Sequence, residues 1–357
     1  MERIASKGYK YSRVIRIWLK LGLIMLIGQV VIGGITRLTG SGLSITKWEI
    51  IVGSLPPLNH SDWMTAFDLY KQTPQFQKIN DAFTLKDFKF IYFWEYFHRL
   101  WVRILGFVFL IPFVFFMVKK RIDSWLVKRL LLVVLLTVIT ASAGWIMVKS
   151  GLIDRPWVNA YKLTLHFVLA LLVISAMVKL IADVYIFESK QMISRRSTLI
   201  LVSITAIQMI SAGLMAGMKA GIFFPSWPSM NGHFIPEILN ESNSWSWANM
   251  ANYDGHLFAP ALVQFIHRNL AYLIVLLTIW CFFFYRKKVE AKSLFWLNSL
   301  LPLVFIQVFL GIFTVLHVKG FVPLYLGVAH QLVGLLFLIS LLFFWFSLRC
   351  NKFSVKS

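Results

Sequence analysis

Four histidines lie inside hydrophobic stretches of this chain of 357 residues, at His98, His166, His267 and His330. Each is a few residues inside the outer end of a predicted membrane span, where an ionisable side chain is costly enough to indicate a function. Two imidazoles that face each other across a helix bundle can supply both axial ligands of a haem iron. The pattern therefore predicts two ligand pairs in the membrane, His98 with His166 and His267 with His330, and a haem for each pair.

Other interpretations of these histidines are weaker. A single histidine near a membrane surface would more often be hydrogen-bonded to a backbone carbonyl, but here the pair is repeated. A zinc or copper site would need three or four clustered ligands, and no third ligand recurs at the same level. The remaining histidines fall in or beside outer loops without counterparts and are interpreted as surface residues: His60, His233, His256 and His317.

The two pairs differ at the residue three positions before the leading histidine. This residue is Glu95 before His98 and Gln264 before His267. Positions i and i+3 share a helix face, so both side chains should lie beside their histidines. Because they are similar in size and only glutamate ionises, we expect the pairs to differ in chemistry. Glu95 is predicted to be the reactive group; the simpler alternative is a carboxylate paired with Arg99 near the interface.

Three arginines lie near the outer ends of the spans, where the propionates of a haem would emerge. Arg99 and Arg268 directly follow the leading histidines, and Arg37 follows the first span. Guanidinium groups pair well with carboxylates, so these residues are candidate cofactor-binding groups. Anchoring at the membrane interface is an equally good explanation for each of them.

The elements that position these residues are predicted to be membrane-spanning helices. The chain is 58% hydrophobic with a mean hydropathy of +0.71, too apolar for a soluble globule, and its nearly uncharged runs are about 20 residues long rather than short and alternating. We therefore predict an all-α integral membrane protein with eight transmembrane helices. Their approximate ranges are 15–35, 91–117, 127–148, 161–186, 198–218, 258–284, 294–316 and 323–347.

The net charge of +21 is interpreted as a sign of topology. The basic clusters fall at the termini and between alternate spans, as the positive-inside rule requires, which argues against nucleic-acid binding. Both termini are then cytoplasmic, in a multi-pass protein of the bacterial inner membrane. The basic N-terminus lacks a small-residue cleavage site, so the first helix is expected to be retained. Cys281 and Cys350 are both predicted near cytoplasmic ends, where a structural disulfide is not expected.

The chain repeats itself. Gly34, Gly42, Trp48 and Pro57 recur 179 residues later, and Gln29 recurs as Gln208 at the same spacing. This predicts two tandem pseudo-symmetric four-helix bundles, residues 1–190 and 191–357, related by an axis along the membrane normal. Each half has a long outer loop after its first helix, at 36–90 and 219–257. The first loop contains a stretch, Ser61–Phe67, that could form an interfacial helix.

These residues resemble a known family. The matching stretches are Gly33–Ser44 (GGITRLTGSGLS), Glu95–Arg99 (EYFHR), Phe265–Arg268 (FIHR) and Ala329–Gln331 (AHQ). Together they resemble haem A synthase of the alpha-proteobacterial and mitochondrial type, and the resemblance extends over nearly the whole chain. One departure concerns cysteine. Some bacterial members carry cysteine pairs in these outer loops, whereas 43–57 and 222–236 contain none, so a mechanism that depends on such pairs is not expected.

The resemblance implies the oxidation of a ring methyl of haem O to a formyl group, which gives haem A for cytochrome oxidase. It implies haem b between His267 and His330, and haem O as the substrate between His98 and His166. Glu95 matches the essential acidic position of the family. Haem O synthase, the cytochrome oxidase assembly machinery and a membrane electron acceptor are the implied partners. The sequence leaves open whether the chain forms a homo-oligomer.

Two other functions share part of this pattern. A di-haem b-type electron carrier would hold permanent haem in both halves, and it would predict equal residues at the Glu95 and Gln264 positions. A transporter could share the duplicated architecture, but the spans lack paired glycine or proline breaks and buried charges near their centres.

Overall fold

A computed structural model describes residues 10–46, 55–153, 155–185 and 195–348, and within them the eight predicted spans are all helices. Each is long and apolar enough to cross a membrane, which confirms the predicted class. Apart from one isolated β-bridge between Met230 and His233, the described regular structure is helical. The spans are α1 Arg13–Leu38, α4 Leu85–Val118, α5 Ser124–Gly151, α6 Ala160–Val184, α7 Arg196–Gly217, α10 Phe258–Tyr285, α11 Ala291–Leu316 and α12 Leu324–Ser347.

Helix α4 begins six residues earlier than the predicted range. Thr84 and Asp87 form a capping box, in which each side chain accepts a hydrogen bond from the backbone N–H of the other residue. Such a box satisfies N–H groups that the first turn would otherwise leave unpaired. The sequence interpretation followed hydropathy alone and therefore missed this polar first turn.

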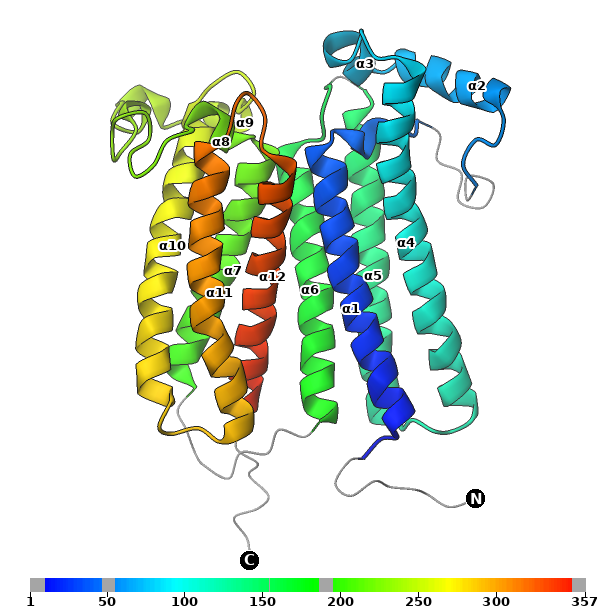
Figure 1. Ribbon diagram of the computed structural model, residues 1–357, viewed down its shortest axis with the longest axis vertical. Coiled ribbons are helices and arrows are strands. Elements are labelled where there is room, and N and C mark those ends of the chain that lie inside the picture. Colours follow the sequence, from blue (N-terminus) through cyan, green and yellow to red (C-terminus); the bar gives the residue numbers. More distant parts are fainter. Residues whose placement is uncertain (1–9, 47–54, 154, 186–194, 349–357) are drawn as a thin grey trace, which may run out of the picture.

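Shorter helices cover the end of the bundle at which α1 finishes (Figure 1). The stretch predicted as an interfacial helix lies in α2, which Asn59 caps at its N-terminus. Phe67 and Tyr70 of α2 pack against Phe88 in the extended first turns of α4. The other short elements are η1 Ser41–Leu43, α3 Pro74–Ile79, α8 Ala220–Phe223, η3 Glu237–Leu239, η4 Ser242–Ser244 and α9 Trp247–Ala251.

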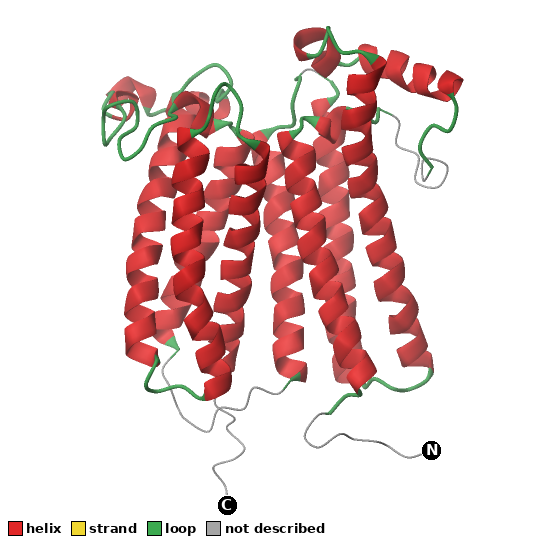
Figure 2. Cartoon of the chain, viewed as in Figure 1, coloured by secondary structure: helices red, strands yellow, loops and turns green. Residues whose placement is uncertain are grey.

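The long helices form two groups of four that stand side by side (Figure 1, Figure 2). In the first group α4 packs on α1 and α5 packs on α6; in the second, α10 packs on α7 and α11 packs on α12. The groups meet through α6 with α7, α1 with α12, and α6 with α12. Exchanging each helix for its repeat partner maps these contacts onto one another. Pseudo-symmetry of the two bundles stays a prediction.

One contact between the groups joins equivalent residues. Arg37 donates to the carbonyl oxygen of Ala216 at 3.3 Å, and these two residues are 179 positions apart, the spacing of the repeat. A contact between equivalent residues lies where a two-fold axis would pass. Nearby, Gly34 lets the side chain of Gln331 approach α1, where Gln331 donates to the Val30 carbonyl at 2.6 Å.

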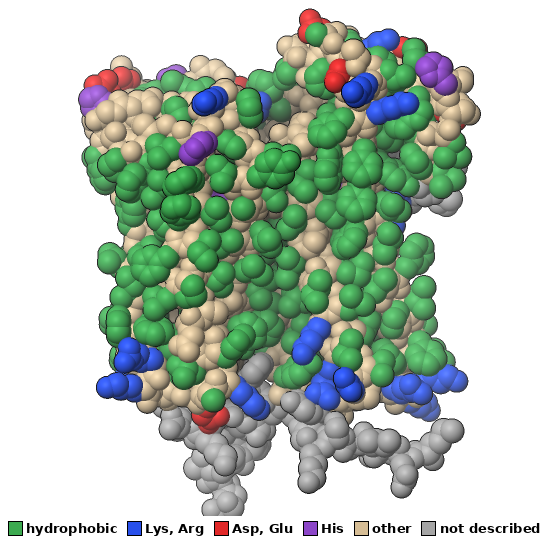
Figure 3. All heavy atoms as spheres, in the orientation of Figure 1, with side chains coloured by type: hydrophobic (Ala, Val, Ile, Leu, Met, Phe, Trp, Pro, Cys, Tyr) green, Lys and Arg blue, Asp and Glu red, His purple; other side chains and the backbone are tan. Residues whose placement is uncertain are grey.

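The apolar core crosses the boundary between the groups. Leu19 of α1, Ile174 of α6 and Leu342 of α12 belong to one buried cluster. Outside it, hydrophobic side chains cover the middle of the molecule, and Lys and Arg gather at the end where α1 begins and α12 finishes (Figure 3). Which end faces the cytoplasm stays a prediction. The predicted boundary between residues 190 and 191 lies outside the described residues.

Candidate functional site

The second predicted pair is brought together with the ring planes inclined at 62°. His267 lies on α10 and His330 on α12, and their ring centroids are 6.4 Å apart. A metal–imidazole bond is about 2 Å long, so this separation leaves room for one metal ion between the rings. Helices α10 and α12 each pack on α7 and α11, and they do not pack closely against each other.

Hydrogen bonds to the rings define which nitrogen can bind a metal in the second half. Nδ1 of His330 lies 3.1 Å from the carbonyl oxygen of Gln307. A carbonyl only accepts hydrogen bonds, so Nδ1 carries the proton and Nε2 keeps its lone pair. Nδ1 of His267 lies 3.1 Å from the hydroxyl of Ser211, which can accept in the same way.

Glutamines contact both rings at the other nitrogen. Nε2 of Gln208 lies 3.3 Å from Nε2 of His267, and Nε2 of Gln307 lies 3.2 Å from Nε2 of His330. An amide N–H donates, so each imidazole Nε2 is an acceptor here. These lone pairs are the ones that a metal ion would use.

The first pair lies at the corresponding place. His98 lies on α4 and His166 on α6, the repeat partners of α10 and α12. Nδ1 of His166 donates to the carbonyl oxygen of Thr140 at 2.9 Å. Thr140 therefore does for His166 what the Gln307 carbonyl does for His330, and His166 also presents its Nε2 lone pair.

Glycines let neighbouring helices approach the rings. A Cβ atom on Gly144 would come within 2.8 Å of His166, and one on Gly311 within 2.9 Å of His330. A Cβ on Gly33 would lie 3.2 Å from Nε2 of His98. Larger residues at these positions would push the rings away, so the close packing is part of what fixes the histidines.

These features fit the predicted haem irons. Each half offers two imidazoles on helices that do not pack closely against each other, and three of the four rings present a defined Nε2 lone pair. Over the described residues, His, Cys, Asp and Glu do not cluster in groups of three or more. Pairs of imidazoles are therefore the donor sets that this fold supplies, and a bis-imidazole iron is the metal that such pairs suit.

Glu95 is held by four hydrogen bonds from the outer loop and its own helix. It is only 3% exposed. Its Oε2 accepts from the backbone N–H and the hydroxyl of Ser44, both at 2.7 Å, and from the N–H of Ile45 at 2.9 Å. Its Oε1 accepts from Arg99. All these partners are donors, so the environment matches the acceptor oxygens of a carboxylate.

Gln264 occupies the equivalent place, but it donates a hydrogen bond to the loop where Glu95 accepts one. It is fully buried, and its Nε2 donates to the carbonyl oxygen of Phe224 at 2.9 Å. Phe224 is 179 positions after Ile45, so the two loops are equivalent. The loop of the first half presents N–H groups, whereas the loop of the second half presents a carbonyl. The difference between the halves therefore includes the loop backbone as well as the side chain.

The guanidinium groups of the three arginines are hydrogen-bonded within the chain in this structure. Arg99 donates to Glu95 and to the Ile45 carbonyl, and Arg268 donates to carbonyls of the loop at Ser226 and Ser229. Arg37 bridges the halves, as described above. Contact between these guanidinium groups and haem propionates stays a prediction.

Sequence reasoning missed several residues of the site. Ser44 was part of the recognised motif but had no assigned role, and Ser211 and the Thr140 carbonyl were not singled out. Comparison of the repeats carried a signal for Ser211, because its counterpart 179 positions earlier is Ile32. The matched Gln29 and Gln208 both donate to the backbone carbonyl of the leading histidine, at 3.3 Å to His98 and 3.1 Å to His267.

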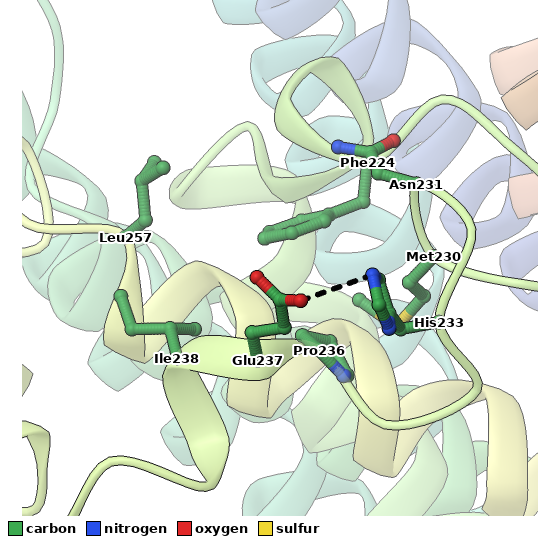
Figure 4. Close-up of a pocket in the computed structure, with 8 residues that line it drawn as sticks. All are labelled: Phe224, Met230, Asn231, His233, Pro236, Glu237, Ile238 and Leu257. Atoms are coloured by element: carbon green, nitrogen blue, oxygen red, sulfur yellow. Dashed lines mark ion pairs between the residues drawn. The ribbon is translucent and has the colours of Figure 1, made fainter.

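The outer loop of the second half contains a cavity of about 240 Å³. Its lining includes His233 and Glu237, whose side chains form an ion pair at 3.2 Å (Figure 4). Both are more than half exposed. His60 and His317 are also exposed and His256 is half-buried, so the outer-loop histidines are surface residues as predicted, with His256 the deepest.

The remaining residues singled out from the sequence are two tryptophans and two cysteines. Trp227 donates to the Tyr272 hydroxyl, and Cys281 is buried as a free thiol. Trp48 and Cys350 lie outside the described residues.

A second contact between the halves lies on the outer face. The hydroxyl of Tyr253 accepts from Arg155 at 2.7 Å and from the backbone N–H of Ala160 at 2.9 Å. Asp254 pairs with Arg155 at 3.0 Å and accepts from the indole of Trp157 at 3.0 Å. The loop before α6 is thereby fixed to the loop before α10.

Comparison with known proteins gives consistent matches over nearly the full length. The family described as cytochrome oxidase assembly protein matches residues 16–342. Heme A synthase of Flavobacterium psychrophilum is 39% identical over 340 residues, which cover 93% of this chain and 97% of that protein. Heme A synthase of Parvibaculum lavamentivorans is 39% identical over 317 residues, 88% of each chain. Heme A synthase of Wolbachia pipientis is 37% identical, covering 96% of this chain and 98% of that protein.

Proposed function

The chain belongs to the cytochrome oxidase assembly protein family, and from this premise we propose that it works as a haem A synthase. It is a multi-pass protein of the bacterial inner membrane and an enzyme of haem A biosynthesis. The reaction we propose is the oxidation of a ring methyl of haem O to a formyl group. The methyl carbon loses four electrons, which a membrane electron acceptor takes; water supplies the oxygen atom of the formyl group, and four protons are released.

We assign haem b to the second half, residues 191–357, between His267 and His330. Both rings have a hydrogen-bond partner at Nδ1, which leaves Nε2 as the ligand atom and suits a cofactor that stays bound. When bound, haem b would supply one-electron chemistry. Haem O would be the substrate of the first half, residues 1–190, between His98 and His166.

The contrast between Glu95 and Gln264 is the observation that carries this proposal. Among the described residues, only the first half has a carboxylate one helical turn from its leading histidine, and that carboxylate is fixed by Ser44, Ile45 and Arg99. A carboxylate that is already oriented can stabilise positive charge that develops at the methyl carbon, or accept the protons released there, without first reorganising. The first half is thus the reactive one.

The partners follow from the reaction. Haem O synthase would supply the substrate, and the assembly of cytochrome oxidase would use the product. Arg37, Arg99 and Arg268 are proposed to meet haem propionates after exchanging some of their present backbone contacts. Association into a homo-oligomer is compatible with the broad apolar surface but is not required by this mechanism.

A di-haem electron carrier is the alternative class. It would need two equivalent sites, whereas the halves differ at the position of Glu95 and in the polarity of the adjoining loop backbone. The deciding experiment is extraction and chromatography of haems after expression with a supply of haem O. We expect haem A together with haem b; haem b alone would support the carrier, and a protein without haem would refute both.

Substitution of the carboxylate tests the assignment of the halves. Glu95→Gln and Glu95→Ala should abolish formation of haem A while haem b remains bound in the second half. The control is Glu241→Gln, because Glu241 lies in the outer loop of the second half, distant in sequence from both pairs. Full activity of both Glu95 variants would refute a role for this residue in the reaction.

A further inference from the structure

The four histidines differ in how their rings are held. Three of them have a hydrogen-bond partner at Nδ1: Thr140 for His166, Ser211 for His267 and Gln307 for His330. Among the described residues, the ring of His98 has no such partner. His98 is therefore the ring that is held by packing alone.

The repeat gives the reason for this difference. Ser211 of α7 is 179 positions after Ile32 of α1, and both residues are buried. Gln29 and Gln208 make the same bond to the backbone of the leading histidine, and Gln208 also lies 3.3 Å from Nε2 of the His267 ring. At Nδ1 the two leading rings differ through one residue pair, a hydroxyl in one half and an alkyl group in the other.

A hydrogen bond at Nδ1 of a ligand histidine affects metal binding in two ways. It fixes the tautomer, so that Nε2 is the ligand atom, and it prevents rotation of the ring away from the metal. Its loss typically weakens metal affinity about 10- to 100-fold. A ring without it can leave the iron more easily.

We propose that Ser211 is a positioning residue that keeps His267 on its iron, and that Ile32 at the equivalent place leaves His98 a ligand that detaches. The second half would then retain its haem, and the first half would exchange its haem after each turnover. This inference rests on the proposed function, because it assumes that the first half takes a substrate and the second half a cofactor. It adds the residues that set the two exchange rates.

The test measures the loss of haem from the purified full-length chain. The protein is loaded with two equivalents of haem b, and an excess of apomyoglobin then captures the haem that dissociates. We expect a fast and a slow phase, with the fast phase absent from His98→Ala and the slow phase absent from His267→Ala. Absorbance reports the transfer without any need for catalytic turnover.

Reciprocal variants then add a hydroxyl beside the leading histidine of the first half and remove it from that of the second half. Ile32→Ser, with Ile32→Thr as a variant closer in volume, should slow the fast phase about 10- to 100-fold. Ser211→Ala should accelerate the slow phase by a similar factor. Ile24→Ser and Ser203→Ala are the matched controls, because both residues are exposed on the same helices, and they should leave both phases unchanged.

The outcomes separate this proposal from the proposed function. If the wild-type chain binds two haems and neither Ile32→Thr nor Ser211→Ala changes a rate, the positioning role is overturned while haem binding stands. If the wild-type chain binds no haem, the proposed function is overturned and this inference with it. The inference would be supported directly if Ile32→Thr lost haem more slowly in the fast phase and still formed haem A.

Discussion

The substitution Ser44→Ala isolates one support of the reactive carboxylate. The Ser44 hydroxyl donates to Oε2 of Glu95 at 2.7 Å, and both residues are almost fully buried. The backbone N–H groups of Ser44 and Ile45 remain in the variant, as does Arg99. The change therefore removes a single donor and leaves the carboxylate and its loop in place.

The size of the effect follows from the kind of bond. A hydrogen bond to a charged group contributes about 1.5–3 kcal/mol, and water cannot easily replace it at a buried site. If the hydroxyl holds Glu95 in its reactive position, the barrier rises by up to that amount. Since about 1.4 kcal/mol corresponds to a factor of ten, the rate should fall about 10- to 100-fold.

The assay is the ratio of haem A to haem O in extracts taken at fixed times, with haem b measured in the same samples. Haem b should be unchanged, because Ser44 belongs to the first half. Ser44→Thr keeps a hydroxyl and should recover most of the activity. Ser41→Ala is the matched control: Ser41 is buried in the same loop, but its hydroxyl bonds to Thr39 and not to Glu95.

Two results would refute this reasoning. Full activity of Ser44→Ala would mean that the remaining donors position Glu95 without the hydroxyl. An equal loss of activity in Ser41→Ala would mean that the loop, rather than the single bond, is what the reaction needs.

Three further predictions concern stability. Gln264→Glu should destabilise the second half by about 1–3 kcal/mol or more, because a carboxylate oxygen would face the carbonyl oxygen of Phe224. Thermal unfolding followed by haem absorbance measures this, and an unchanged midpoint would contradict it. Tyr253→Phe should cost about 1–3 kcal/mol, since the buried N–H of Ala160 loses its acceptor; denaturant unfolding checks it against Tyr325→Phe, an exposed control. The pKa of Asp123 is lowered from 3.8 to about 2, because hydrogen bonds from Lys10 and the Leu126 N–H outweigh the opposing effect of burial. The ionised Asp123 therefore stabilises the fold above pH 4, and this contribution is lost toward pH 2. Asp123→Asn should reduce the dependence of the free energy of unfolding on pH between these values, and an unaltered dependence would contradict this role of Asp123.

The helices were predictable because hydropathy over a membrane-length window depends on local sequence. The bounds of α10 and α12 agree with the predicted ranges to one residue at each end. The start of α4 was wrong because its first turn is polar and depends on the Thr84 capping box. The position of α2 was anticipated only as a segment, Ser61–Phe67, since amphipathic pattern alone did not distinguish it from a solvated loop.

The candidate histidines were also predictable, because the repeat placed two of them in each half. The rings of His267 and His330 lie 6.4 Å apart, and their binding of a haem stays a prediction. What the repeat could not provide is the set of partners around each ring. The acceptors for His166 and His330 are backbone carbonyls, which every residue has and which leave no mark in the sequence.

The sequence by itself determined the membrane class, the duplicated set of helices, the four histidines and the contrast between Glu95 and Gln264. All of these depend on residue types at regular spacings. Only the tertiary structure decided that the loop meets Glu95 with N–H groups and Gln264 with a carbonyl, and that His98 lacks the support that Ser211 gives to His267. These contacts join residues about 40–56 positions apart, and their hydrogen-bonding sense depends on how each loop backbone is turned toward its helix.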